Sequence, residues 1–282
     1  MTNPRELKRR IRTIRNIERT VDAMQKISAA RLARVRNATV RGRPYTDALV
    51  TLVHDLAASG QVSHPLLDVR EGDSYLLLAI GADRGMCGAY NANCMRAATD
   101  FISTRRRDTL YFETAGRRIL SFSPRTNARV IREVLHHHRP LSEVAVADIA
   151  DAFINAYLNR GAVRTYILYT EFRSATGNHP VVRRILPIMP KPQPFAAERI
   201  FEPVPAEILD RLMPLYVRTA VRQAFLEAEA SEHAARMVTM EQASVSARRM
   251  ISELTLVANR LRQSMITREL DDIFGTTEAL AA

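Results

Sequence analysis

Residues 243–265 read ASVSARRMISELTLVANRLRQSM, and apolar residues recur in this stretch at steps of three and four. The recurring positions are Ala243, Ala247, Met250, Leu254, Val257, Leu261 and Met265. Such a narrow apolar stripe is typical of a helix that pairs with another helix in a coiled coil. The segment from Leu215 to Phe274 contains neither Pro nor Gly, and a helix of that length would extend for roughly 90 Å. Because a globular domain cannot cover such a rod, we expect other helices of this chain, other chains, or both to surround it.

The first segment has a similar pattern. Between Pro4 and Gly42 there is no Pro or Gly, and Asn3-Pro4 supplies a helix start. The apolar positions are Leu7, Ile11, Ile14, Ile17, Val21, Met24, Ile27, Leu32 and Val35. We expect a kink or pause at Pro44, and a break at Pro214 after a short helix that begins near Pro205. The two long helices are predicted to pair antiparallel.

Between these helices the pattern changes to alternating strands and helices. A continuous apolar run at 75–81 predicts a strand buried on both faces. Residues 109–113 and 163–169 also predict strands, and 91–103 and 148–159 predict helices. Residues 180–187 are flanked by Pro180 and Pro187, which suits an edge strand. Alternation of this kind favours a parallel sheet with right-handed crossovers.

These patterns predict an α/β fold with three segments. An N-terminal coiled-coil helix spans 1–60, an α/β domain spans 61–204, and a C-terminal coiled-coil helix spans 205–282. The fold is therefore a long antiparallel coiled coil of the N- and C-terminal helices, with an inserted Rossmann-like and mostly parallel α/β domain.

The charge balance restricts the kind of partner. The formal net charge is +11, from 41 Lys and Arg against 30 Asp and Glu. Basic residues crowd the first helix, and the last helix is biased towards acidic residues, so the two segments could attract each other. No run of about 18 apolar residues is present, so we expect no membrane span, and the first residues lack the apolar region of a secretory signal.

Candidate catalytic patterns are weak. Gly81, Gly85 and Gly88 follow a strand but match neither dinucleotide-binding nor P-loop spacing, so a structural turn is the better interpretation. The tract 136–138 consists of three histidines, and we interpret it as a solvated loop rather than a metal site. Cys87 and Cys94 match no zinc or disulfide pattern and are expected to be buried. We therefore predict no catalytic residues, no metal and no cofactor.

Several segments resemble one known family. The N-terminal segment contributes Leu7-Lys-Arg-Arg-Ile11, Ala23-Met24-Gln25, Ile27-Ser-Ala-Ala-Arg-Leu32 and Arg43-Pro44-Tyr45. The middle contributes His64-Pro65-Leu66-Leu67, Asp83-Arg84-Gly85-x-Cys87-Gly88 and Tyr90-Asn91-x-Asn93. The end contributes Ser231-Glu232-His233-Ala234-Ala235-Arg236-Met237, Glu253-Leu254-Thr255-Leu256 and Asn259-x-x-Arg262-Gln263-x-x-Ile266-Thr267-x-Glu269-Leu270. In this order and over the full length, the chain resembles the γ subunit of F-type ATP synthases.

The resemblance implies a non-catalytic central-stalk rotor subunit that couples ion flow through the membrane c ring to conformational change in the catalytic α/β hexamer. ATP would be bound by β rather than by this chain. The implied partners are the α and β subunits, the ε subunit and the c ring, with no direct nucleic acid and with membrane association only through the complex. The implied location is the cytoplasmic face of a bacterial inner membrane.

The resemblance also implies which residues make contacts. Residues expected to meet the hexamer are Met24, Lys26, Arg262, Gln263, Thr267 and Glu269. The α/β domain would act as the foot, with a turn formed by Asp83, Arg84, Gly85 and Gly88. On the last helix, Leu261 and Met265 are expected to pack on the partner helix while the polar side chains face the hexamer.

Other interpretations are also available from the residues. The Arg-rich first helix suggests a basic coiled-coil nucleic-acid-binding protein, although that helix has few aromatic residues for stacking. The strand and glycine turn at 75–91 suggest a Rossmann-type nucleotide-binding enzyme. Departures from the family pattern at Lys26, Arg31, Ala82, Ala89 and Ala258 are compatible with a divergent or sodium-linked subtype as well as with a housekeeping synthase.

Overall fold

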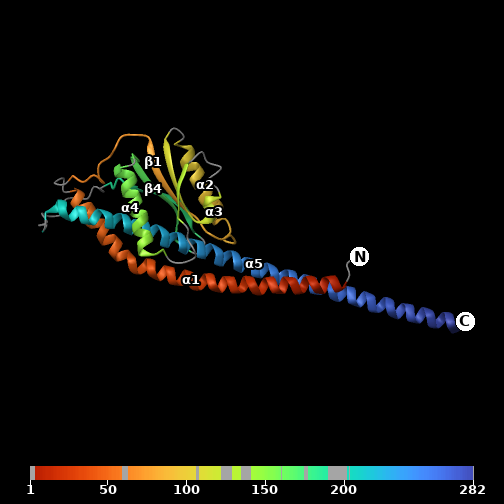
Figure 1. Cartoon of the computed structure of the whole chain (residues 1–282). Coiled ribbons are helices and arrows are strands. Elements are labelled where there is room, and N and C mark those ends of the chain that lie inside the picture. Colours follow the sequence, from red (N-terminus) through yellow and green to blue (C-terminus); the bar gives the residue numbers. More distant parts are fainter. Residues whose placement is uncertain are drawn as a thin grey trace. The chain divides into compact units, whose positions relative to one another are not determined.

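The computed structural model describes residues 4–58, 63–105, 108–121, 129–134, 141–159, 161–174, 177–189, 202 and 204–281. The histidine tract 136–138 lies outside these residues. The chain divides into two compact units. Unit 1 contains Met1–Ser28 and Met237–Ala282, and unit 2 contains Ala29–Arg236. Figure 1 shows the chain with both units.

Two long helices contribute residues to both units: α1 spans Pro4–Ala58 and α5 spans Pro205–Ala281. Both run through an internal proline, Pro44 in α1 and Pro214 in α5, so a pause at Pro44 and a break at Pro214 are wrong, while the alternative of a kink at Pro44 stays a prediction. An internal proline loses one backbone hydrogen bond and costs about 3 kcal/mol. Apolar residues beyond Pro44 and on both sides of Pro214 are buried in one core: Leu49, Val53, Leu56, Leu209, Met213 and Val217. Each buried side chain contributes about 1.5–3 kcal/mol, which outweighs the cost of each proline.

In unit 1, α1 and α5 run antiparallel, as predicted (Figure 1). An ion pair joins them where Arg248 Nε donates to Glu18 Oε1 over 2.9 Å. Leu7 and Ile11 are buried, and on α5 Leu254 and Leu261 are half-buried. These residues lie on the stripe that the sequence predicted.

The rest of the predicted stripe is partly wrong. Ile17 is 52% exposed and Ile27 is 55% exposed, whereas Glu18 and Gln25 are half-buried and Ser28 is buried. Apart from Asp22 and Met24, which are also half-buried, the less exposed positions from Leu7 to Ser28 on α1 form one strict heptad: Leu7, Ile11, Ile14, Glu18, Val21, Gln25 and Ser28. On α5 they are Met240, Ser244, Ala247, Ile251, Leu254, Ala258 and Leu261. A supercoiled pair keeps a 3.5-residue repeat in contact, so the geometry of pairing selects polar Glu18 over apolar Ile17.

Unit 2 contains a five-stranded sheet in the order β3-β2-β1-β4-β5. Its strands are β1 (Ser74–Ile80), β2 (Thr109–Ala115), β3 (Arg129–Val134), β4 (Arg164–Glu171) and β5 (His179–Leu186). The first four pair in parallel, and β5 pairs antiparallel to β4 at one edge. The mostly parallel sheet and the β5 edge strand agree with the prediction. Strand β3 was not predicted, because its apolar run is short and flanked by charged residues.

Helices cover both faces of this sheet (Figure 1). On one face lie α2 (Tyr90–Ser103) and α3 (Arg117–Leu120), with a core that contains Leu77, Cys94 and Phe112. On the other face lie α4 (Glu143–Asn159) and the unit 2 parts of α1 and α5. Both cysteines are buried and free, as expected, and burial raises the pKa of Cys94 to about 12. The sheet thus packs against α2 on one face and against α5 on the other.

Truncating Ile11 and Ile17 to alanine, one at a time, tests which of the two lies on the packed stripe of α1. We expect Ile11→Ala to destabilise the paired helices by about 2–4 kcal/mol, because the buried side chain leaves a cavity. Ile17→Ala is the matched control and should change the free energy by less than about 0.5 kcal/mol, because the side chain is already exposed. Hydrogen exchange of the backbone amides of residues 5–28 measures both. Equal effects would contradict the assignment.

Glycine substitutions test the packing at the end of the sheet. Gly116 has φ of +100°, and a Cβ placed on it would lie 2.4 Å from the Gly81 carbonyl oxygen. Gly161 has φ of +77°, with nothing within 4 Å of a Cβ. We expect Gly116→Ala to cost about 2–5 kcal/mol, from left-handed strain plus overpacking, and Gly161→Ala about 1–2 kcal/mol, from strain alone. Urea unfolding followed by circular dichroism gives the two values, and the reverse order would refute the close approach.

Candidate functional site

The carboxyl end of β1 leads into a tight turn at residues 81–89. Gly81 N–H donates to the Ala115 carbonyl over 2.8 Å, which joins the ends of β1 and β2. Ala82 N–H donates to Asn91 Oδ1 over 3.0 Å, and Asp83 Oδ1 accepts from Arg117 N–H over 3.1 Å. The Asp83 side chain therefore satisfies a backbone group of a neighbouring segment, and the Asn91 side chain of α2 satisfies a backbone group of the turn.

The backbone conformation and close packing of the turn explain two of its glycines, Gly85 and Gly88. A Cβ on Gly85 would lie 3.1 Å from Arg118 Nη2, and Gly88 has φ of +55°. Arg84 and Met86 are exposed, and Cys87 is buried beneath the turn. The structure thus brings Asp83, Arg84, Gly85 and Gly88 together in one turn at the carboxyl edge of the sheet.

This edge is where open α/β sheets usually bind a ligand, at the point where the strand order reverses. Here that point lies between β1 and β4, and α5 occupies it. Ser231 Oγ of α5 donates to the Thr170 carbonyl of β4 over 3.0 Å. From the other side, the Tyr90 hydroxyl donates to the Ala228 carbonyl of α5 over 3.3 Å. The helix is therefore hydrogen-bonded to two elements of the α/β domain, β4 and the start of α2.

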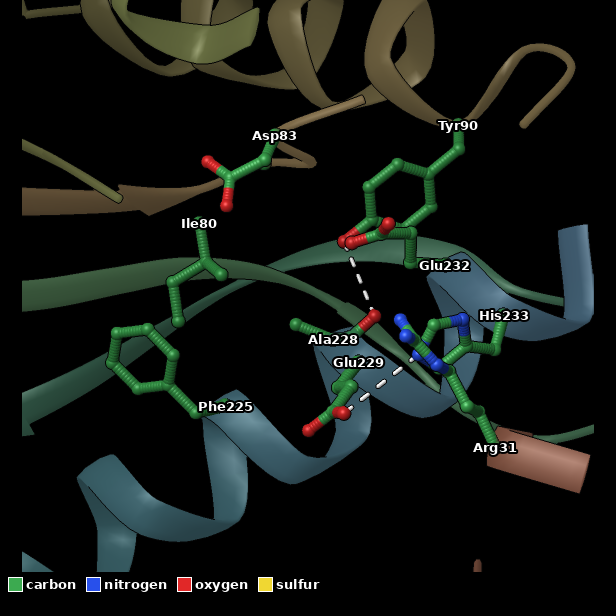
Figure 2. A pocket seen from close by; sticks show the side chains of 10 residues that line it. Arg31, Ile80, Asp83, Tyr90, Phe225, Ala228, Glu229, Glu232 and His233 are labelled. Carbon is green, nitrogen blue, oxygen red and sulfur yellow. Dashed lines mark hydrogen bonds and ion pairs between the residues drawn. The ribbon is translucent and has the colours of Figure 1, made fainter. Parts of the chain in front are cut away.

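Figure 2 shows the space that remains between the turn and α5. It is a cavity of about 40 Å³, lined by Arg31, Ile80, Gly81, Asp83, Tyr90, Phe225, Ala228, Glu229, Glu232 and His233. Ligand pockets in proteins usually have volumes of about 300–1,000 Å³. This crevice is too small for a nucleotide, because the helix fills it.

The charges around the cavity are also unsuited to phosphate. Three carboxylates line it, from Asp83, Glu229 and Glu232, against the side chains of Arg31 and His233. His233 Nε2 lies 3.7 Å from Glu229 Oε1 (Figure 2). Because like charges repel at short distance, a phosphate group would be disfavoured here.

On α5, a further charged side chain lies against the turn. Arg236 Nη2 donates to Glu232 Oε1 over 2.6 Å, and Arg236 Nη1 lies 3.4 Å from His233 Nδ1. Burial raises the pKa of the Cys87 thiol, while the charge of Arg236 lowers it and that of Glu232 raises it. Glu232 lines the cavity beside Asp83 of the turn, so the Glu232–Arg236 pair lies at this end of the cavity.

A larger hollow of about 640 Å³ lies between α1, α4 and α5 of unit 2. Arg222 pairs there with Glu143, and Arg218 pairs with Asp151 over 3.2 Å. These charges already have partners, and no glycine turn or strand end opens into the hollow. Within the described residues, no group of His, Cys, Asp or Glu could hold a metal ion.

The predicted hexamer contacts lie on unit 1. Met24 is half-buried, and Lys26 is exposed and pairs with Asp22 over 2.8 Å. Arg262, Gln263, Thr267 and Glu269 are all exposed.

These residues form two separate groups. Since Glu18 meets Arg248 and the helices are antiparallel, Met24 and Lys26 lie alongside residues before Arg248. Residues 262–269 lie on the opposite side of that ion pair, so the structure does not bring the two groups together.

The expected packing of Met265 is wrong within the described residues. Met265 is 45% exposed, and every residue from Arg262 to Leu270 is exposed. Leu261 is the last half-buried position of the stripe, so the side chains after it lack a partner helix among the described residues.

Sequence reasoning also missed a set of exposed apolar side chains on unit 1. They are Ile17, Ile27, Val245, Met250, Leu256, Val257, Met265, Ile266 and Leu270. The sequence pattern places Ile17, Ile27, Met250, Val257 and Met265 on the paired stripe. A strict 3.5-residue repeat separates the first four from the packed positions, whereas Met265 fits that repeat and is nevertheless exposed. No helix among the described residues is long and apolar enough to cross a membrane.

Comparisons with known proteins place the chain in one family. Residues 3–280 match the family model described as ATP synthase. The ATP synthase gamma chain of Pelotomaculum thermopropionicum is 36% identical over 99% of this chain and 100% of its own length. That of Dehalococcoides mccartyi is 35% identical over 100% of both, and that of Geobacter sp. strain M21 is 35% identical over 99% of both.

Solved structures have the same fold. A chain of Euglena gracilis mitochondrial ATP synthase matches with a TM-score of 0.68 at 18% identity, covering 98% of this chain and 94% of that chain. A chain from the central stalk and c ring of Tetrahymena thermophila mitochondrial ATP synthase matches with a TM-score of 0.63 at 18% identity, covering 80% and 99%. These matches confirm the predicted fold class.

The resemblance read from the sequence motifs is therefore confirmed. So is the prediction of a non-catalytic subunit of an ATP synthase, because the relatives are gamma chains over their whole length. Neither the nucleic-acid-binding nor the Rossmann-enzyme alternative is supported. The chain belongs to the ATP synthase gamma chain family.

Proposed function

We propose that this chain is the central-stalk rotor that couples ion flow through the c ring to conformational change in the α/β hexamer. The observation that carries this proposal is the exposed apolar surface of unit 1. Large apolar side chains such as Met250, Leu256 and Ile266 are about half exposed. The first two lie where α5 pairs with α1, and Ile266 lies beyond Leu261, the last half-buried position of the stripe. Exposed apolar surface on this scale is typical of an interaction site, and a sleeve of other subunits would cover it.

The shape of unit 1 suits this role physically. Two paired helices resist bending and twisting better than one. The pair is also asymmetric, so the three catalytic sites around it would meet different side chains. A rotor can bias a site only through contacts that differ between the states of that site.

Individual contacts follow from the exposed positions. We assign Met24 and Lys26 to one level of the shaft and Arg262, Gln263, Thr267 and Glu269 to another. Exposed hydrogen bonds and ion pairs contribute about 0–1 kcal/mol each, which suits contacts that break on every turn. The segments 1–60 and 205–282 would form the shaft, and 61–204 would form the foot that meets the ε subunit and the c ring.

Family membership supports a peripheral position at a membrane, and the particular membrane is part of our proposal. We place this chain on the cytoplasmic face of a bacterial inner membrane, held there through the c ring.

Rotation can be measured with a label on the foot. Val144 is 71% exposed at the start of α4, and Cys87 and Cys94 are buried, so Val144→Cys gives one reactive thiol for a bead among the described residues. With the α/β hexamer fixed to a surface, we expect ATP to drive stepwise rotation of the bead. The chain without the hexamer should not hydrolyse ATP. A bead that stays still on an active, assembled hexamer would rule out the rotor function.

The C-terminal contacts can be separated from packing by two variants. Arg262→Ala/Glu269→Ala should lower coupled turnover of the assembled complex by about two- to thirtyfold, because about 0.2–1 kcal/mol is lost at each of two contacts. It should leave the unfolding of the isolated chain unchanged within about 0.5 kcal/mol, since both side chains are exposed.

Leu254→Asp is the comparison, because Leu254 lies on the paired stripe. We expect it to weaken helix pairing and assembly together, since a carboxylate would enter an apolar contact. If the polar double variant destabilised the isolated chain as much as Leu254→Asp, the division into contact face and packing face would be wrong.

A further inference from the structure

Two sequence motifs that the proposed function does not explain meet in unit 2. One is the turn and helix start at 81–91, and the other is the α5 segment 228–236. We propose that their contact is the joint that transmits torque between the α/β foot and α5, and that Tyr90 and the Glu232–Arg236 pair are positioning residues that fix its angle. The inference rests on the proposed rotor function and adds a specific site to it.

A rotor needs a connection that resists rolling of the helix about its own axis. The apolar core between α5 and the sheet contains residues such as Val217, Val221 and Phe225. Apolar attraction is non-directional, so this core holds α5 against the sheet but resists rolling only through shape. Directional contacts are required to fix the angle.

Such contacts occur at the carboxyl edge of the sheet. Tyr90, at the start of α2, donates to the Ala228 carbonyl, and Ser231 of α5 donates to the Thr170 carbonyl of β4. The two hydrogen bonds are one helical turn apart on α5, and they attach to different elements of the α/β domain. Hydrogen bonds weaken steeply when their angle changes. A roll of α5 in either direction would therefore strain at least one of them.

Close packing supports these hydrogen bonds. Ala82, Cys87 and Tyr90 form a small buried cluster against Ala235 of α5. Small side chains allow the turn and the helix to approach closely, which leaves little space for the helix to shift. Interiors packed in this way have low compressibility and transmit strain.

The ion pair on α5 is unusually buried. The side chains of Arg236 and Glu232 are 9% and 16% exposed, and Ser231 and His233 beside them are buried as well. A buried ion pair contributes little net stability, because desolvation offsets the attraction. Its benefit here is orientation: within α5, Arg236 contacts both Glu232 and His233, and Glu232 lines the cavity together with Asp83 and Tyr90.

An exposed ion pair provides the matched comparison. Arg218 of α5 pairs with Asp151 of α4, so this pair runs from α5 to the α/β domain, whereas Glu232 and Arg236 both belong to α5. The side chains of Arg218 and Asp151 are 43% and 51% exposed. Exposed pairs are screened by water and contribute little. If any charged link between the foot and α5 were sufficient, removing this pair would soften the joint as well.

The test measures torsional stiffness in the assembled complex. The bead on Val144→Cys reports the angle of the foot while the hexamer, fixed to a surface and without ATP, holds the shaft. For Glu232→Gln/Arg236→Met we expect the variance of the bead angle to rise at least twofold, and for Tyr90→Phe a smaller rise. Asp151→Asn should leave the variance unchanged.

A charge-exchange variant separates orientation from folding. Glu232→Arg/Arg236→Glu restores an ion pair at the same spacing, and we expect it to return the variance most of the way to that of the parent chain. ATP hydrolysis by the detached hexamer, which works against no load, should be the same for all variants. Ion pumping per ATP in vesicles should fall in the same order as stiffness.

The outcomes distinguish this inference from the proposed function. If the parent bead does not rotate with ATP, the rotor function itself fails. If the parent rotates but both Tyr90→Phe and Glu232→Gln/Arg236→Met leave the variance unchanged, the joint is refuted and the rotor function stands. An equal rise in Asp151→Asn would also overturn the joint, because it would show a general loosening of α5.

Discussion

The packing of α5 against the sheet of unit 2 is the interaction on which the rest of the structure depends. Leu209, Met213 and Val217 are buried in the same core as Leu76 and Ile167 of the central strands. This burial keeps the helix continuous through Pro214, and the same helix then supplies one half of unit 1. One element thus serves as core helix in the α/β domain and as half of the coiled coil.

The position of α5 also explains why this sheet, whose architecture often binds nucleotides, has no space for one at its carboxyl edge. The sheet has the parallel order and glycine turn that make a phosphate site plausible. In the described structure, α5 occupies the crevice at the switch point, and its Ala228 carbonyl accepts a hydrogen bond from the Tyr90 hydroxyl. A fold alone therefore does not determine function. The decisive feature is what fills its usual binding site.

In unit 1, the periodicity of the paired helices decides which side chains are buried. A supercoiled pair can bury only every third and fourth residue in a strict 3.5 repeat. Apolar residues outside that repeat, such as Ile17 and Met250, are left exposed, and polar ones within it, such as Glu18, are covered. Glu18 is accommodated because its carboxylate reaches Arg248 across the pair. The result is a helix pair with apolar side chains left over for other subunits.

The sequence by itself determined the fold class, the antiparallel pairing, most strands and the family, because these depend on composition, periodicity and local turn chemistry. Long uninterrupted helical segments and apolar runs such as 75–80 are local signals. The tertiary structure decided which of Ile17 and Glu18 lies on the packed stripe, the continuity of the helices through Pro44 and Pro214, and the occupation of the crevice by α5. Each of these depends on contacts between residues far apart in the chain, where burial against a partner outweighs local preference.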